Sequence, residues 1–122
     1  MTDFILVPSR VPEALERMTD VDAFRASASF NDLTPEERSI PGVVTASFTQ
    51  FALNSGTPSE VALQLLQVLE DLAALEDLDV DNLLMVDAIE MIDPADLERM
   101  RPQFGAALNR LVADSEARWA GA

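Results

Sequence analysis

The 122-residue chain contains no cysteine, histidine or tyrosine, and all eight of its basic residues are arginine, so lysine is missing too. Without histidine the chain lacks the commonest general base and transition-metal ligand. Without cysteine it has no thiol nucleophile or zinc–thiolate site, and without lysine it has no Schiff-base chemistry. Carboxylates, guanidinium groups and hydroxyls remain for chemistry. This inventory favours a binding protein over an enzyme, and we expect no cofactor and no bound metal.

Long apolar segments are also missing. No part of the chain approaches the roughly 20 apolar residues of a membrane-spanning helix. The apolar run at residues 4–7 ends at Pro8 and is too short for a signal peptide. We therefore expect no membrane association and a cytoplasmic location, with which the absence of cysteine is consistent.

Helix signals recur along the chain. Thr34-Pro35, Thr57-Pro58 and Asp93-Pro94 each join a capping residue to a proline, with an acid three residues after the cap, as is typical of helix starts. Gly56 is expected to adopt a left-handed conformation that ends the preceding helix. With the hydrophobic periodicity, these signals predict helices over 12–18, 21–31, 35–39, 42–54, 58–77, 80–92, 94–100 and 102–119.

We predict an all-α fold in which residues 1–122 form one single-domain helical bundle of five or six substantial helices, with residues 1–11 as an extended N-terminal arm. Apolar side chains surround nearly the whole circumference of the predicted helix 80–92, so we place that helix at the centre. The predicted final helix has an apolar face that we expect to be buried, formed by Phe104, Leu108, Leu111, Val112 and Trp119.

The predicted helix 58–77 is amphipathic and carries the candidate binding residues. Its polar side holds a stripe of Glu60, Gln64, Gln67 and Asp71, with Glu70 and Asp77 flanking it. We expect these acids to be exposed and dispensable for the fold. Leu63 interrupts the polar side and is either an exposed anchor for a partner or partly covered by the N-terminal segment.

The net charge of −14 is distributed unevenly. Residues 39–98 hold twelve acids and no base, whereas residues 99–122 hold two acids and four arginines. Such a one-sign surface goes beyond what solubility needs and suggests a basic partner, either a protein surface or a nucleic-acid-binding site that it mimics. The alternative is a surface that only keeps the protein soluble. Nucleic-acid binding is disfavoured, because phosphate contacts need a basic stripe.

Two acidic arrangements could carry chemistry. Residues 77–82 place acids at alternate positions, as a calcium loop does, but lack its glycine and its final bidentate glutamate. We interpret this segment as a connection in which Asp79 or Asp81 caps the next helix. The carboxylates of Glu90, Asp93 and Asp96 are spaced for acid–base work, although acids at such spacing are usually solvated charges or caps.

The second half of the chain resembles a known family. Residues 80–86 (VDNLLMV) lead into 88–92 (AIEMI), residues 100–104 (MRPQF) follow, and the chain ends near Arg118-Trp119. This pattern, over residues 58–119, resembles small all-helical immunity proteins of bacterial polymorphic and contact-dependent toxin systems. Arg101 stands where that family tends to have glycine before Pro102. The resemblance implies neutralisation of a toxin by occlusion and transfers no catalytic residue.

We therefore expect a cytoplasmic immunity protein, or antitoxin-like inhibitor, that binds a cognate toxin or other basic protein surface as a monomer or weak homodimer. The expected contact residues are Glu60, Leu63, Gln64, Gln67, Glu70, Asp71 and Asp77. One alternative is a regulatory adaptor or secretion chaperone that holds a partner helix in an apolar groove. The other is an enzyme that uses carboxylates alone and buries an acid pair in a cleft.

Overall fold

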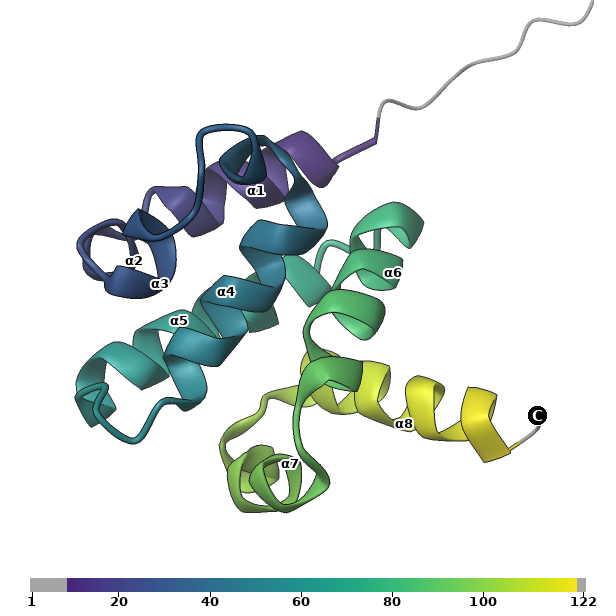
Figure 1. Cartoon of the computed structure of the whole chain (residues 1–122). Coiled ribbons are helices and arrows are strands. Elements are labelled where there is room, and N and C mark those ends of the chain that lie inside the picture. Colours follow the sequence, from purple (N-terminus) through teal and green to yellow (C-terminus); the bar gives the residue numbers. More distant parts are fainter. Residues whose placement is uncertain (1–8, 121–122) are drawn as a thin grey trace, which may run out of the picture.

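The structure is a computed structural model that describes residues 9–120 (Figure 1). Across these residues the chain forms eight α-helices and three single-turn 3-10 helices and contains no strand, which confirms the predicted all-α fold. The elements are α1 Val11–Thr19, α2 Asp22–Arg25, α3 Ala28–Asn31, η1 Glu37–Ser39, α4 Pro41–Leu53, α5 Ser59–Ala73, α6 Leu78–Asp87, η2 Ile89–Met91, α7 Pro94–Met100, η3 Arg101–Gln103 and α8 Ala106–Ala120. Residues 1–8, and with them most of the predicted N-terminal arm, lie outside the described part.

Two of the predicted helix starts have the contacts that their sequence signals imply. Thr34 and Glu37 form a reciprocal capping box: the Thr34 N–H donates to Glu37 Oε1 at 2.8 Å, and the Glu37 N–H donates to Thr34 Oγ1 at 3.1 Å. Asp93 Oδ1 accepts from the N–H of Ala95 at 3.0 Å and caps α7. Both helix starts depend on local contacts, because each hydrogen bond joins residues at most three apart in the sequence.

The third start, before α5, is built differently from the prediction. The Thr57 hydroxyl donates to the carbonyl of Phe51 at 2.7 Å, and α5 has no side-chain cap. Gly56 does not have a positive φ; its N–H instead donates to Asn54 Oδ1 at 2.8 Å, closing the turn. Among residues 9–120 the positive φ is found at Glu76, at 54°, in the turn after α5.

Several predicted helices are shorter or divided. The predicted helix 21–31 is two helices, because Ser27 ends α2 and caps α3, where its Oγ accepts from the N–H of Phe30. The predicted helix 58–77 ends at Ala73, and 80–92 becomes α6 and η2, separated at Ala88. Pro102 starts only the turn η3, and the long C-terminal helix begins at Ala106.

Helix α4 is the most completely covered helix of the bundle. It packs against α1, α3, α5 and α6, and Val44 and Phe48 have no exposed surface. Its buried hydroxyls are satisfied within the helix: Thr45 Oγ1 donates to the Pro41 carbonyl at 2.7 Å, and Thr49 Oγ1 to the Thr45 carbonyl at 2.8 Å. Helix α4 is thus the interior helix of the bundle, as expected for a helix that is apolar on most sides.

Helix α6 shares the interior but is covered less fully than predicted. It contacts α1, α4, α5 and α8, and Val80 and Leu84 are buried. Leu78 and Val86 are exposed on its outer side, and Met91 in η2 is exposed as well. The helix therefore has an uncovered outer side along its length, from Leu78 at its first residue to Val86 near its end.

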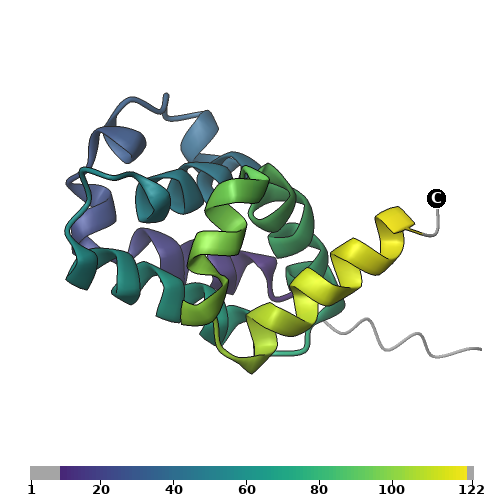
Figure 2. The same cartoon turned by 90° about the horizontal axis from the view of Figure 1, so that it is seen from below.

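Helix α8 lies across the end of the bundle, and its last turns project away from the other helices (Figure 2). Leu108, Leu111, Val112 and Ser115 are buried. Trp119 continues the same stripe in register, yet 64% of its surface is exposed. The prediction that Trp119 is buried is wrong, because the helix extends beyond the elements that cover its inner face.

Candidate partner-binding face

The outer side of α5 carries the predicted polar stripe. Glu60, Gln64, Gln67 and Asp71 are all exposed, opposite a face of buried leucines. Gln67 Nε2 donates to Asp71 Oδ1 at 2.8 Å, one helical turn away. The stripe follows directly from the amphipathic pattern, because burial of the leucines leaves the opposite face in water.

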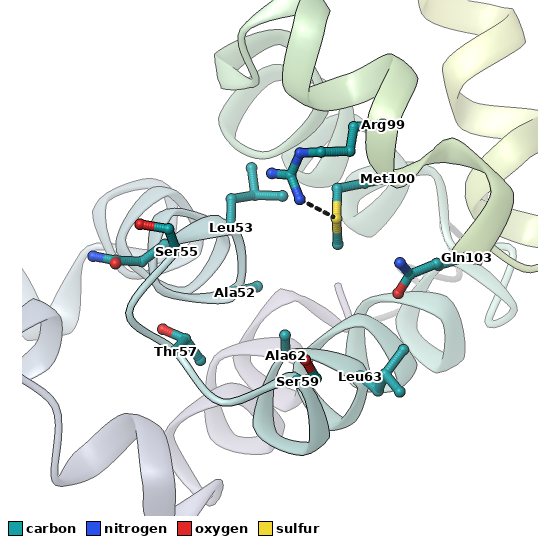
Figure 3. A pocket seen from close by; sticks show the side chains of 11 residues that line it. Ala52, Leu53, Ser55, Thr57, Ser59, Ala62, Leu63, Arg99, Met100 and Gln103 are labelled. Carbon is teal, nitrogen blue, oxygen red and sulfur yellow. Dashed lines mark hydrogen bonds between the residues drawn. The ribbon is translucent and has the colours of Figure 1, made fainter.

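Leu63 lies on this exposed side at the edge of a groove, with 51% of its side chain exposed. The groove has a volume of about 660 Å³ and runs between the end of α4, the α4–α5 loop, the start of α5, and α7 with η3 (Figure 3). Leu53, Leu63 and Met100 provide its apolar surface, and Ser55, Thr57 and Gln103 line it with polar groups. On the α7 side, Arg99 Nη1 donates to Met100 Sδ at 3.4 Å.

A second, smaller hollow of about 240 Å³ lies on the other side of Leu63, between α5 and the segment that joins η3 to α8. Leu63 and Gln103 line both hollows. Leu63 is therefore an exposed apolar side chain between two hollows, and the acidic and amide side chains of α5 lie beside it. We call the exposed residues Glu60, Leu63, Gln64, Gln67 and Asp71 the α5 face.

Glu70, predicted to be a dispensable surface acid, is part of the fold. It is half-buried, and its carboxylate accepts from the N–H groups of Ala107 at 2.8 Å and Leu108 at 3.0 Å. It thus caps the N-terminus of α8, where unpaired N–H groups and the helix dipole favour an anion. A Cβ at Gly105 would come within 2.5 Å of the carboxyl group, so this glycine leaves room for the cap.

Asp77 is likewise structural. Its Oδ1 accepts from the N–H groups of Asp79 and Val80, both at 3.0 Å, and caps α6. The expectation that Asp79 or Asp81 caps this helix is wrong, because the capping residue is Asp77, two residues before Asp79. Most of the segment 77–82 is helical, and the prediction that Glu70 and Asp77 contribute nothing to the fold is wrong for both.

The acids and arginines that the sequence separates are brought together by α8. Arg110 Nη1 lies 3.2 Å from Asp81 Oδ2, and Arg118 Nη2 lies 2.8 Å from Glu90 Oε2, which also accepts from the Ser115 hydroxyl at 3.1 Å. The pKa of Arg110 is raised, chiefly by its hydrogen bond to Asp81. The acidic middle of the chain is thus partly neutralised where α8 crosses it.

The carboxylates considered for acid–base chemistry have separate structural contacts. Glu90 binds Arg118, Asp93 caps α7, and Asp96 pairs with Arg99 at 3.2 Å. Within residues 9–120 no three carboxylates are grouped so as to hold a metal ion. In the same part of the chain, no helix is both long and apolar enough to cross a membrane.

Sequence reasoning missed the residues that α7 and η3 contribute to the groove, above all Met100 and Gln103. No local pattern marks them, because they face α5 only through tertiary packing. Comparisons of the chain with protein-family models, with curated proteins and with solved structures gave no match.

Proposed function

We propose that this protein is an immunity protein or antitoxin-like inhibitor that binds a basic surface of a cognate toxin through the α5 face. The observation that carries the proposal is Leu63, half-exposed between two hollows and bordered by the acidic and amide side chains of α5. An apolar anchor within a polar surround is typical of protein interfaces, in which a few central side chains provide most of the affinity.

The mechanism divides between long-range and short-range forces. The net charge of −14 attracts a basic protein surface over distances up to the Debye length. Leu63 then enters an apolar depression of the toxin, while Glu60 and Asp71 meet cationic side chains at the rim. Inhibition follows from occlusion and requires no catalytic group.

The groove beside Leu63 favours a second candidate, an adaptor that holds a partner's helix. Its apolar surface from Leu53, Leu63 and Met100 suits an inserted amphipathic helix. This candidate predicts binding without protection of cells from a toxin, and dimerisation of the free protein. A growth assay with sedimentation of the free protein therefore separates the two.

The proposal predicts that the protein encoded beside this chain's gene arrests growth when it is expressed alone in a bacterial host; a neighbour without this effect would contradict the proposal. Co-expression of the wild-type chain should restore growth, and Leu63→Arg should fail to do so. Met91→Arg is the matched control, since Met91 is 56% exposed and lies in η2, away from the α5 face. Equal protection by Leu63→Arg and the wild type would contradict the α5 face as the binding site.

A kinetic measurement tests the electrostatic part on the purified pair. The association rate should fall steeply between low and physiological salt, whereas the dissociation rate changes less. An association rate that does not respond to salt would remove charge steering from the mechanism. Protection in the growth assay would then have to depend on the Leu63 contact alone.

A further inference from the structure

A second groove lies between α6 and α8 and shares no residue with the α5 face. Its volume is about 520 Å³. Leu78 and Met85 of α6 provide its apolar surface, and the fully buried Leu111 of α8 lies beneath it. It is open along its length, as a cleft between two helices is when no third element covers it.

Leu78 is the most exposed large apolar side chain of residues 9–120, at 83%. It is the first residue of α6, and the capping contacts of Asp77 hold the backbone immediately around it. The helix start sets the backbone position of Leu78, and its side chain lies in solvent. Burial of such a side chain by a partner releases water at no cost in backbone ordering.

The charges around the groove select the partner. Asp79, Asp81 and Asp114 line it, together with a single arginine, Arg110. Arg110 already contacts Asp81 and Asp114, and it also donates to the carbonyl of Ala73 at 3.0 Å. The groove thus has three carboxylates and one guanidinium group, and this guanidinium already contacts two of them. The net charge of the groove is negative.

Asp79 and Asp114 are the acids with exposed surface at the groove. Asp79 follows Leu78 directly on α6, and Asp114 lies on the facing helix α8. Cationic side chains of a ligand can therefore reach a carboxylate on either wall while an apolar side chain covers Leu78. An anionic ligand would meet like charge on both walls.

We propose that the α6–α8 groove binds a basic amphipathic helix of a partner protein, with leucine-type side chains against Leu78 and Met85 and lysine or arginine at Asp79 and Asp114. Helix-in-groove recognition suits a cleft between two helices, and the apolar stripe of the ligand supplies the contacts along it. The charge complementarity specifies a cationic ligand.

The proposal is independent of the α5 face, because the two surfaces use different residues of different helices. A single partner can occupy both, or two partners one each. The groove retains its ligand even if Leu63 has no role.

The test uses the full chain and a synthetic, end-capped helical peptide with leucine at one face and lysine elsewhere, labelled for fluorescence anisotropy. A peptide with glutamate in place of lysine is the charge control. The lysine peptide should bind and the glutamate peptide should not. In amide NMR spectra the shifts should cluster at Leu78, Asp79 and Asp114.

Variants locate the site. Leu78→Ala should weaken binding by about tenfold, as expected for loss of one buried leucine contact. Asp79→Asn with Asp114→Asn should weaken it by about threefold to tenfold at low salt, and less at high salt. Met91→Ala, and Glu16→Gln with Asp20→Asn, are matched controls at exposed residues outside both the groove and the α5 face, and should leave the affinity within about twofold.

Three results would overturn the proposal. One is unchanged affinity in both groove variants. Another is a set of NMR shifts confined to the α5 face or spread over all acidic surfaces. The third is a dimer of the free protein that Leu78→Ala dissociates in sedimentation, which would assign the groove to a second copy of the chain.

Discussion

The N-terminal region, α1 to α4, and the C-terminal region, α5 to α8, are held together by different kinds of contact. In the N-terminal region Phe24 is surrounded by aromatic rings, with centroids at 5.0 Å for Phe48, 5.3 Å for Phe30 and 6.3 Å for Phe51. In the C-terminal region the long-range hydrogen bonds and ion pairs converge on α8, through Glu70, Arg110 and Arg118.

The two kinds of contact contribute differently to the stability of the fold and to the placement of its helices. Apolar and aromatic packing supplies large stabilisation, and it involves no charge that salt could screen or pH could titrate. Each polar contact of α8 adds less to the free energy of unfolding. Together these contacts determine how α8 lies on the core, in which Leu108 and Leu111 are buried. Substitutions should therefore cost most in the aromatic cluster and least at exposed caps.

The largest effect is expected from Phe48→Ala. Phe48 is fully buried and packs edge-on against Phe24, so its loss leaves a cavity in the N-terminal region. The free energy of unfolding should fall by about 3–5 kcal/mol, measured by urea unfolding followed by circular dichroism. The loss should be the same at low and high salt. Gln50→Ala, at an exposed site on the same helix, should change it by no more than about 0.5 kcal/mol.

The next effect is expected from Ile89→Ala. Ile89 is buried in η2, directly after the break at Ala88, and joins the C-terminal region to the core. The free energy of unfolding should fall by about 2–5 kcal/mol in the same assay. A loss below about 1 kcal/mol would mean that η2 is peripheral to the core.

A smaller effect is expected from the cap of α8. Glu70→Ala should lower the free energy of unfolding by about 1–2 kcal/mol, because the N–H groups of Ala107 and Leu108 lose their acceptor. Gly105→Ala should cost a similar amount in the wild type, since its Cβ displaces the same carboxyl group.

The double variant tests the shared cause. Once Glu70 is alanine, Gly105→Ala should cost much less than it does in the wild type, so the two losses should be non-additive. Asp71→Ala, on the neighbouring exposed position of α5, is the matched control and should change stability little. Additive losses would mean that Gly105 and the cap act separately.

The smallest effect is expected at Glu37 in the N-terminal region. The Thr34 N–H, and to a lesser extent the Thr34 hydroxyl, lower the pKa of Glu37 below its ordinary value. A depressed carboxyl pKa stabilises the folded state above the unfolded value of about 4.3, and this contribution is lost as the pH falls through the folded pKa. NMR titration of the Glu37 carboxyl should show the lowered pKa. Thr34→Val, which keeps the backbone N–H, should retain most of it.

The candidate site was predictable in part. Glu60, Gln64, Gln67 and Asp71 are exposed as the helical spacing indicates, because an amphipathic pattern reports directly which face meets water. Glu70 lies beside them in sequence but turns toward α8, a partner 37 residues away. No spacing within α5 distinguishes Glu70 from Asp71.

The groove next to Leu63 could likewise be predicted only in part from the sequence. Leu63 itself stands out in the sequence as an apolar residue on a polar side. Gln103 and Met100, which complete the groove, are ordinary residues of α7 and η3 until the fold places them opposite α5.

Sequence patterns alone were sufficient to predict the all-α fold, the capping box at Thr34 and Glu37, the cap at Asp93 and the exposed side of α5. These features depend on contacts between residues at most four apart, so their signals lie within one helical turn. The capping role of Glu70 and the exposure of Trp119, by contrast, follow from the tertiary arrangement of the helices. Each of these depends on which helices meet, and a carboxylate or an indole is the same in sequence whether a neighbour covers it or not.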